Sequence, residues 1–406
     1  MRAYERFLKY AVIHTRSDDS TGTTPSTECQ FDLARYLVDE MKEIGIADAY
    51  VDEKCYVYGS LPATSGCEGI PCVMFCAHLD TADFEAEHVK PRLIENYDGG
   101  EVALGNSGRT LSPGQFPELS KLAGQTLIVT DGTTLLGADD KAGIAEIMTM
   151  AETLIREGRP HGSLKFCFPP DEEIGNGAQH LDIPKFGAKL GYTVDGGKLG
   201  MVQYENFNAA YAEIDIKGIG VHPGSAKDIM INALLVANEF NNMLPSGEIP
   251  RNTSGYEGFF HVLRWHGTVD ECHMEYIVRD HNRTLFEGRK QTMRHIAELL
   301  NDKYGEGTVV LKLRDEYSNM AEVINQHYEL IDYAVQATRM TGHEEIITPI
   351  RGGTDGAQLS LRGLPCPDIG TGLYGAHGPY EHITVEAMDT VTQILLNIVQ
   401  LFTEKG

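Results

Sequence analysis

The sequence predicts an α/β protein with a second, smaller unit inserted into the first. Strand-like and helix-like segments alternate over residues 1–207, and this alternation returns over 319–406. Between them, residues 208–318 follow a different order of strands and helices. The 406-residue length also favours two units, because single cores usually stop growing at ~250–300 residues, although one large domain would still be possible.

Within residues 1–207, short apolar runs predict buried strands at 71–77, 125–130 and 163–168. Residues 142–157 have the periodicity of an amphipathic helix. The carboxyl ends of parallel strands in such a sheet lie along one edge, which is where α/β folds bind ligands. Polar residues that directly follow these strands are therefore the first candidates for a site.

The segment 208–318 predicts a ferredoxin-like βαββαβ unit. Its strands are expected at 210–217, 259–269, 272–279 and 308–314, and its helices at 225–243 and 283–304. Beyond it, helices are expected near 322–341 and 386–405, with the turn-rich segment 349–357 between them. We therefore expect a catalytic domain built from 1–207 and 319–406, and a lid-like domain, 208–318, inserted into it.

Composition limits the classes of partner. The chain has 34 Lys and Arg against 59 Asp and Glu, a formal charge of −25, which would repel nucleic acid and anionic membranes. A solvated acidic surface explains most of this charge, although carboxylates that bind hard cations would add to it. The N-terminus lacks the apolar core of a signal peptide, no apolar run of ~18 residues follows, and the eight scattered cysteines favour reduced thiols. We expect a cytoplasmic protein.

His78 and Asp80 directly follow the predicted strand 71–77. Residues at i and i+2 of an extended chain point to the same side, so the two side chains can meet. A carboxylate on one imidazole nitrogen fixes the tautomer and is the usual support of a zinc-bound histidine. Taken alone, the pair is as well explained by a structural hydrogen bond.

Asp139 and Asp140 lie between the strand 125–130 and the helix 142–157. An aspartate at a helix N-terminus is ordinarily a cap, but a cap requires only one of them. Asp195 follows the apolar residues 191–194, at another strand end. A second acid at this edge adds to the candidates for a shared site.

Asp171, Glu172 and Glu173 follow the strand 163–168 and a Pro-Pro pair. Three consecutive acids repel one another, so a buried cluster favours a bound cation, whereas an exposed one would be a solvated acidic turn. His377 lies in the turn-rich loop 375–381, where a lone histidine is usually a surface residue. Together, two histidines and several carboxylates could hold two metal ions, which would need a bridging carboxylate and a separate base.

Five motifs of the chain, in the order in which they occur, resemble the peptidase T group of the co-catalytic zinc peptidase family, which also contains acetylornithine deacetylase and succinyl-diaminopimelate desuccinylase. The resemblance covers nearly the whole chain and lies in residues 77–82, 132–143, 170–175, 221–224 and 349–357. It implies a zinc-peptidase-like catalytic domain with a central mixed sheet, and an inserted ferredoxin-like domain that serves as lid and dimerisation surface.

The resemblance also implies a ligand set. His78 and Asp195 would hold one zinc ion, Glu173 and His377 would hold the other, and Asp140 would bridge them. Two Zn²⁺ per subunit are therefore expected, with Co or Mn as possible replacements.

Asp80 would orient His78, and Glu172 would be the general base that deprotonates the bridging water. The implied activity is removal of the N-terminal residue from short peptides, above all tripeptides. The alternatives are a dipeptidase, carboxypeptidase or N-acyl-amino-acid deacylase on the same scaffold, or an inactive peptide-binding or assembly subunit.

The inserted domain supplies the expected substrate contacts. His222 would stabilise the oxyanion, in its own subunit or across a homodimer formed through this domain. Arg279 and Arg351 could each bind a peptide carboxylate through a bidentate guanidinium, and Asn232 is a further candidate contact. A buried turn histidine and surface salt bridges are the plainer interpretations. Residues 373–376 lack the asparagine usual in the peptidase T group, which leaves substrate length open.

Overall fold

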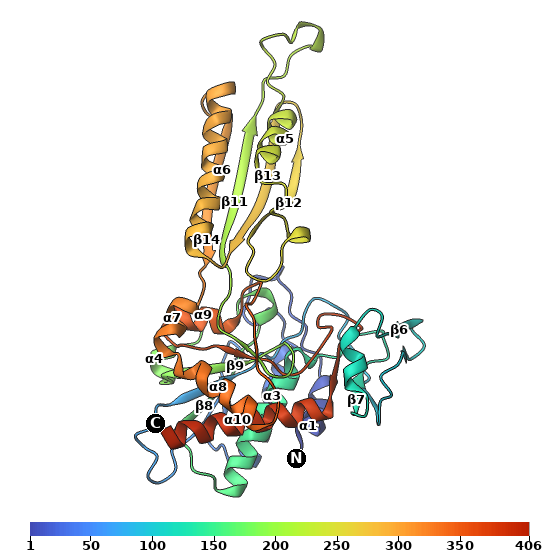
Figure 1. Ribbon diagram of the computed structural model, residues 1–406, viewed down its shortest axis with the longest axis vertical. Helices are drawn as coiled ribbons and strands as arrows, with labels where there is room; N and C mark the ends of the chain where they lie inside the picture. The colour runs from blue at the N-terminus through green and yellow to red at the C-terminus, as the bar shows by residue number, and fades with distance from the viewer. Residues whose placement is uncertain (406) are drawn as a thin grey trace. The chain divides into compact units, whose positions relative to one another are not determined.

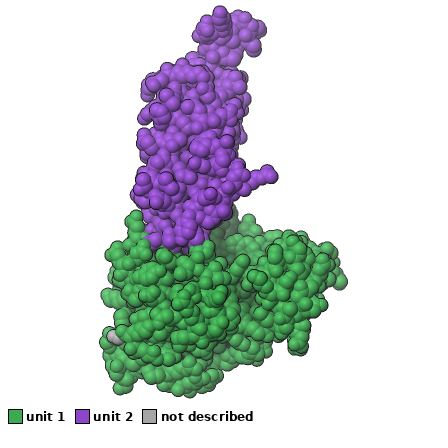
Figure 2. Space-filling model, in the orientation of Figure 1, with its two compact units in different colours: residues 1–204, 322–348, 354–406 green, residues 205–321, 349–353 purple. Residues whose placement is uncertain are grey.

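The computed structural model describes residues 1–405, which form two compact units (Figure 2). Unit 1 comprises residues 1–204, 322–348 and 354–405, and unit 2 comprises 205–321 and 349–353. The short segment 349–353, which the sequence pattern assigns to the first domain, therefore belongs with the inserted unit.

The core of unit 1 is an eight-stranded mixed sheet, in the order β1-β2-β8-β3-β9-β16-β10-β15. The strands are β1 (Tyr50–Val51), β2 (Val57–Leu61), β8 (Leu164–Phe168), β3 (Val73–Cys76), β9 (Leu190–Val194), β16 (Asp368–Ile369), β10 (Met201–Gln203) and β15 (Ile346–Ile347). β3 runs parallel to both of its neighbours, β8 and β9, whereas β2 is antiparallel to β8. The predicted α/β class with a central mixed sheet is confirmed.

Strand β3 is buried at all four positions, as its continuous apolar run predicts. Helices cover the sheet (Figure 1). They are α1 (Ala3–Ala11), α2 (Gln30–Ile44), α3 (Ala138–Glu157), α4 (Ile183–Phe186), α7 (Ala321–Ile324, at the unit boundary), α8 (Glu329–Met340), α9 (Asp355–Leu361) and α10 (Val385–Lys405). Helix α3 packs against both α1 and α10, and its apolar residues are therefore buried nearly all round.

Unit 1 also contains two smaller sheets. One has the order β17-β7-β4, with β17 (His382–Thr384), β7 (Leu127–Val129) and β4 (Arg92–Ile94), and the other pairs β5 (Val102–Leu104) with β6 (Arg109–Leu111). Strand β17 pairs with β7 at His382 and Val129, which brings the loop before β17 to the start of α3. Short 3-10 helices lie at Pro117–Leu122, Glu172–Ile174 and Asn325–His327.

Unit 2 has a four-stranded antiparallel sheet, in the order β12-β13-β11-β14. In chain order its elements are β11 (Asn208–Lys217), α5 (Ala233–Met243), β12 (Phe259–Gly267), β13 (Glu271–Asp280), α6 (Arg283–Tyr304) and β14 (Val309–Tyr317), with 3-10 turns at Pro223–Ser225 and Pro250–Asn252. Alternate residues of β13 are buried against the helices, as a strand with one covered face requires.

Two predicted helices differ from the structure. Helix α5 begins at Ala233 rather than near residue 225, because the Asn232 side chain accepts hydrogen bonds from two backbone N–H groups and caps it there. The predicted helix 322–341 is divided into α7, a 3-10 turn and α8. Within residues 1–405, none of the helices combines the length and the apolar composition that a membrane span requires.

Candidate metal centre and active site

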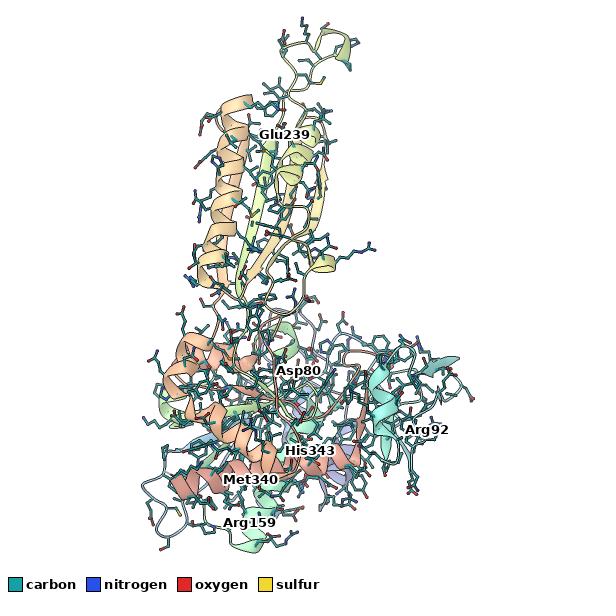
Figure 3. All side chains as sticks on the ribbon, in the orientation of Figure 1. Asp80, Arg92, Arg159, Glu239, Met340 and His343 are labelled. Carbon is teal, nitrogen blue, oxygen red and sulfur yellow. The ribbon has the colours of Figure 1, made fainter. Side chains whose placement is uncertain are left out.

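The carboxyl ends of three neighbouring parallel strands supply most of the predicted site. His78 and Asp80 follow β3, Glu172 and Glu173 follow β8, and Asp195 follows β9. These strands are adjacent in the sheet, so the residues after them lie along one edge, as in other α/β ligand sites. Asp80 lies inside unit 1 in Figure 3.

Asp139 lies between the two histidines. Its Oδ1 is 3.2 Å from Nε2 of His78, and its Oδ2 is 3.2 Å from Nε2 of His377. His78 Nε2 is also 3.7 Å from Asp195 Oδ1, and His377 Nε2 is 3.2 Å from Glu173 Oε2. The Nε2 atom of each imidazole thus has one carboxylate of its own and shares that of Asp139.

Asp140 has a different environment. It is fully buried, its Oδ2 accepts a hydrogen bond of 3.1 Å from the backbone N–H of His78, and its ligand atoms group with those of His78 and Asp195. Within residues 1–405 it forms no hydrogen bond or ion pair with His377 or Glu173. The family resemblance assigns the bridging position to Asp140, whereas the carboxylate that lies between the two histidines is that of Asp139. Neither aspartate caps α3, because the backbone at both is non-helical and the N-cap is Gly137.

Asp80 joins the histidine to the turn that carries the predicted base. Its Oδ1 is 3.2 Å from His78 Nδ1, as the i, i+2 pattern predicts for a supporting carboxylate. The same carboxylate accepts hydrogen bonds from the backbone N–H groups of Glu172, at 2.9 Å, and Glu173, at 3.2 Å. Asp80 therefore lies beside an imidazole and holds the turn after β8.

Burial and crowding of like charges dominate the electrostatics. Burial, with the neighbouring carboxylates, raises the pKa of Glu172 and Asp195 well above the ordinary range and raises that of Glu173 to about 7. The hydrogen bond with Asp139 raises the pKa of His377 to about 9. Together these shifts indicate that, without a cation, the buried carboxyl groups of this site hold protons at a pH at which exposed carboxyl groups are ionised.

The donors fit divalent cations. Glu173 Oε1 is buried and lacks a hydrogen-bond partner among residues 1–405. In the same part of the chain, no Lys or Arg forms an ion pair with Asp139, Glu173 or Asp195. The groups His78, Asp140, Asp195 and His78, Asp139, Glu173 each bring their ligand atoms within 4.8 Å of one another. Imidazole nitrogen and carboxylate oxygen are ligands that zinc takes.

The predicted substrate contacts lie in unit 2, and each has protein partners there. His222 is exposed, and its Nδ1 accepts a hydrogen bond from the Gly224 N–H at 3.1 Å. Asn232 is the cap of α5. Arg279 donates to the Ala210 carbonyl and pairs with Glu316 at 3.0 Å.

Arg351 is also engaged within unit 2. Its guanidinium donates to the carbonyls of Gly255, at 2.7 Å, and Glu257, at 2.9 Å, and to the Thr253 hydroxyl at 3.0 Å. Neither arginine thus presents a guanidinium without protein partners, and their contact with substrate stays a prediction.

Glu381 is a supporting residue that the sequence pattern does not single out. It is buried and accepts hydrogen bonds from the backbone N–H groups of Leu136, Gly137 and Asp139, at 2.8–2.9 Å. It therefore holds the loop that carries Asp139. Its only sequence signal is its place at the end of the 375–381 motif, four residues after His377.

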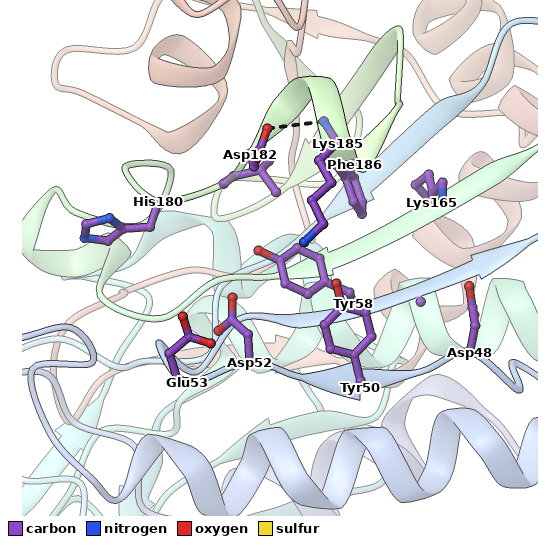
Figure 4. Close-up of a pocket in the computed structure, with 12 residues that line it drawn as sticks. Asp48, Tyr50, Asp52, Glu53, Tyr58, Lys165, His180, Asp182, Lys185 and Phe186 are labelled. Carbon is purple, nitrogen blue, oxygen red and sulfur yellow. Dashed lines mark hydrogen bonds between the residues drawn. The ribbon is translucent and has the colours of Figure 1, made fainter.

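Unit 1 also has a surface cavity of about 330 Å³ (Figure 4). It is lined by Asp48, Tyr50, Asp52, Glu53, Tyr58, Gly59, Lys165, His180, Leu181, Asp182, Lys185 and Phe186. None of these is a predicted site residue, so this cavity is distinct from the histidine and carboxylate cluster.

A cluster of imidazole and carboxylate groups at the strand ends of a mixed α/β sheet is the arrangement expected of a metal-dependent hydrolase. The family model described as Peptidase family M20/M25/M40 matches residues 130–401, and the chain belongs to this family.

The relatives give the branch of the family. The chain is 49% identical over 407 residues to a Peptidase T of Clostridium perfringens, with 100% of both chains covered. Its fold is similar to that of aminopeptidase PepT from Bacillus cereus, with a TM-score of 0.79 and 21% identity over 100% of this chain and 98% of that one. A tripeptidase from Staphylococcus aureus gives a TM-score of 0.78 and 20% identity over the same shares. The predicted resemblance and the predicted class, a hydrolytic aminopeptidase, are confirmed.

Proposed function

We propose that this protein removes the N-terminal residue from short peptides, above all tripeptides, by attack of a water activated by two zinc ions. The position of Asp139 carries the proposal, because one carboxylate faces two imidazoles that each have a further carboxylate beside them. The relatives named Peptidase T and tripeptidase support the substrate class.

In this proposal, His78 and Asp195 hold one ion, and His377 and Glu173 hold the other. Asp139 bridges them, in place of Asp140. Two zinc ions held by these residues would supply Lewis-acid chemistry, which polarises a carbonyl and lowers the pKa of a bound water. Co or Mn could replace zinc, since the ligands are imidazoles and carboxylates.

Glu172 is the proposed general base. Its carboxyl group forms no hydrogen bond or ion pair with another side chain in residues 1–405, so in its ionised form it can take the proton of the attacking water and return it to the leaving amine. Asp80 acts beside it by orienting His78 and by holding the Glu172 backbone.

For substrate contacts we propose His222 as a donor to the oxyanion, in its own subunit or across a homodimer formed through unit 2. Asn232 is proposed as a further contact. Arg279 and Arg351 would bind a peptide carboxylate only if they released hydrogen-bond partners that they have in unit 2. We place the protein in the cytoplasm. A dipeptidase, carboxypeptidase or N-acyl-amino-acid deacylase would use the same metal residues.

The test is hydrolysis of unblocked di-, tri- and tetrapeptides and of N-acylated amino acids with added zinc, comparing the natural protein with Glu172→Gln. We expect release of the first residue chiefly from tripeptides, and a loss in Glu172→Gln of about 10²–10⁴-fold, the usual contribution of a general base. The variant should bind as much metal as the natural protein, because Glu172 is not among the proposed ligands. Cleavage of only dipeptides or acylated substrates would refute the tripeptide assignment, and full activity of Glu172→Gln would refute its role.

A further inference from the structure

The turn that carries Glu172 begins with a buried carboxylate that the proposed reaction does not use. Asp171 is fully buried and lies directly after β8. Its Oδ1 accepts hydrogen bonds from the Ser26 hydroxyl at 2.6 Å and from Gln30 Nε2 at 2.7 Å, and its Oδ2 accepts from the Ser26 N–H at 2.8 Å. Gln30 Oε1 in turn accepts from the Asp171 N–H at 3.3 Å.

These donors belong to a distant part of the chain. Gln30 is the first residue of α2, Ser26 lies just before that helix, and both are buried. Helix α2 contacts β2, next to β8 in the main sheet, and also α3. The start of α2 is thus a fixed support, and Asp171 is attached to it through both its side chain and its backbone.

The backbone of Asp171 also needs support. Its φ of 61° lies in the left-handed region, which a residue other than glycine adopts at some cost, though aspartate and asparagine tolerate it best. The Glu172 N–H then donates to Asp80, and the Glu172 carbonyl accepts from the Gly175 N–H at 2.6 Å. The main chain of Glu172 is therefore held on both sides, with Asp171 setting the direction in which the turn starts.

We propose that Asp171, Gln30 and Ser26 form a positioning unit that fixes the direction of the Glu172 side chain. None of the three touches the cluster of histidines and metal-binding carboxylates through a hydrogen bond or ion pair in residues 1–405, so their effect acts through the Glu172 backbone. A left-handed turn alone would require only glycine or asparagine. A buried carboxylate with three donors does more, because it ties that turn to α2 by charge-assisted hydrogen bonds.

This inference rests on the proposed role of Glu172. A general base must lie within about 2.6–3.2 Å of the proton that it takes. A misplacement of about 1 Å, even by a change away from the reacting atoms, can lower the rate about a hundredfold. Loosening the positioning unit should therefore lower kcat, whereas KM and the metal content at saturating zinc should stay unchanged, because Glu173 is the only proposed ligand in this turn and acts with four others.

Gln30→Met is the first variant, because it keeps the volume and helix propensity of Gln30 but removes both amide contacts with Asp171. Asp171→Asn is the second, since asparagine tolerates the left-handed backbone while losing the negative charge. Glu40→Gln is the matched control. Glu40 lies in the same helix, is also buried and also has two side-chain partners, Arg6 and Tyr10, but does not contact the turn.

Each protein would be assayed for kcat, KM and bound zinc on the best substrate of the natural protein, and for amide hydrogen exchange over residues 171–176. We expect kcat to fall about 10- to 100-fold in Gln30→Met and Asp171→Asn, with KM within about threefold, zinc content unchanged and faster exchange in this segment. Glu40→Gln should change none of these.

Three results would overturn the inference: an unchanged kcat in both variants, an equal fall in Glu40→Gln, or a fall that follows loss of zinc. If the natural protein hydrolyses no peptide, the proposed function fails by itself. Hydrogen exchange then decides whether the positioning unit holds the turn. Unaltered exchange in Gln30→Met would show that it does not, and faster exchange confined to residues 171–176 would show that it does.

Discussion

Replacing Glu381 with glutamine should destabilise the loop that carries Asp139. Glu381 Oε2 accepts hydrogen bonds from the N–H groups of Leu136 and Gly137, and Oε1 accepts from that of Asp139. Glutamine has only one oxygen. In its better orientation it keeps the first two bonds and turns its NH₂ group toward the Asp139 N–H, which is left without an acceptor.

The magnitude follows from these three bonds. Hydrogen bonds to a charged group contribute about 1.5–3 kcal/mol, and those between neutral groups contribute about 0.5–1.5 kcal/mol. The substitution removes one bond and weakens the other two, because their acceptor becomes neutral. Removal of a buried charge offsets part of this loss. We expect the free energy of unfolding to fall by about 2–4 kcal/mol at pH 8.

Urea unfolding of the metal-depleted proteins at pH 8 would measure this difference, and zinc titration would show whether affinity falls as well. Glu386→Gln is the control, because Glu386 is exposed and accepts a single backbone hydrogen bond, from the Thr126 N–H at 2.9 Å. Its cost should stay below about 1 kcal/mol. Equal costs for the two variants, or a Glu381→Gln protein as stable as the natural one, would refute the reasoning.

Two further predictions concern the metal centre. Without metal, the free energy of unfolding should fall as pH rises from about 5 to 9. In the folded protein the pKa of Glu173 is about 7 and that of His377 about 9, above their ordinary values of 4.5 and 6.5. The folded protein therefore holds more protons than the unfolded chain over this range, and raising the pH destabilises it. Thermal unfolding across this range checks it, and a stability that rises with pH would contradict the sign; zinc-loaded protein should vary less. Asp139→Asn should reduce bound zinc from two ions toward one or none, whereas Asp140→Asn should retain two, as metal analysis after dialysis would show. The reverse order would return the bridging role to Asp140.

Local patterns in the sequence were sufficient for much of the fold and for the kinds of residue in the site. A continuous apolar run predicted strand β3, because a strand covered on both faces has no polar side to alternate with. The spacing of His78 and Asp80 predicted their contact, since i and i+2 point the same way on an extended chain. Acids after strand ends indicated a shared edge, and resemblance to a family assigned their chemistry.

Only the tertiary structure decided which neighbouring acid has which environment. Asp139 and Asp140 are equivalent in a local pattern, and they differ because non-helical backbone at the start of α3 brings one between His78 and His377 and buries the other. The contact of Gln30 with Asp171 joins residues far apart in the chain, and no periodicity records such a pair. Sequence patterns carry short-range geometry, whereas these partners are selected by the packing of α2, the sheet and the loops around it.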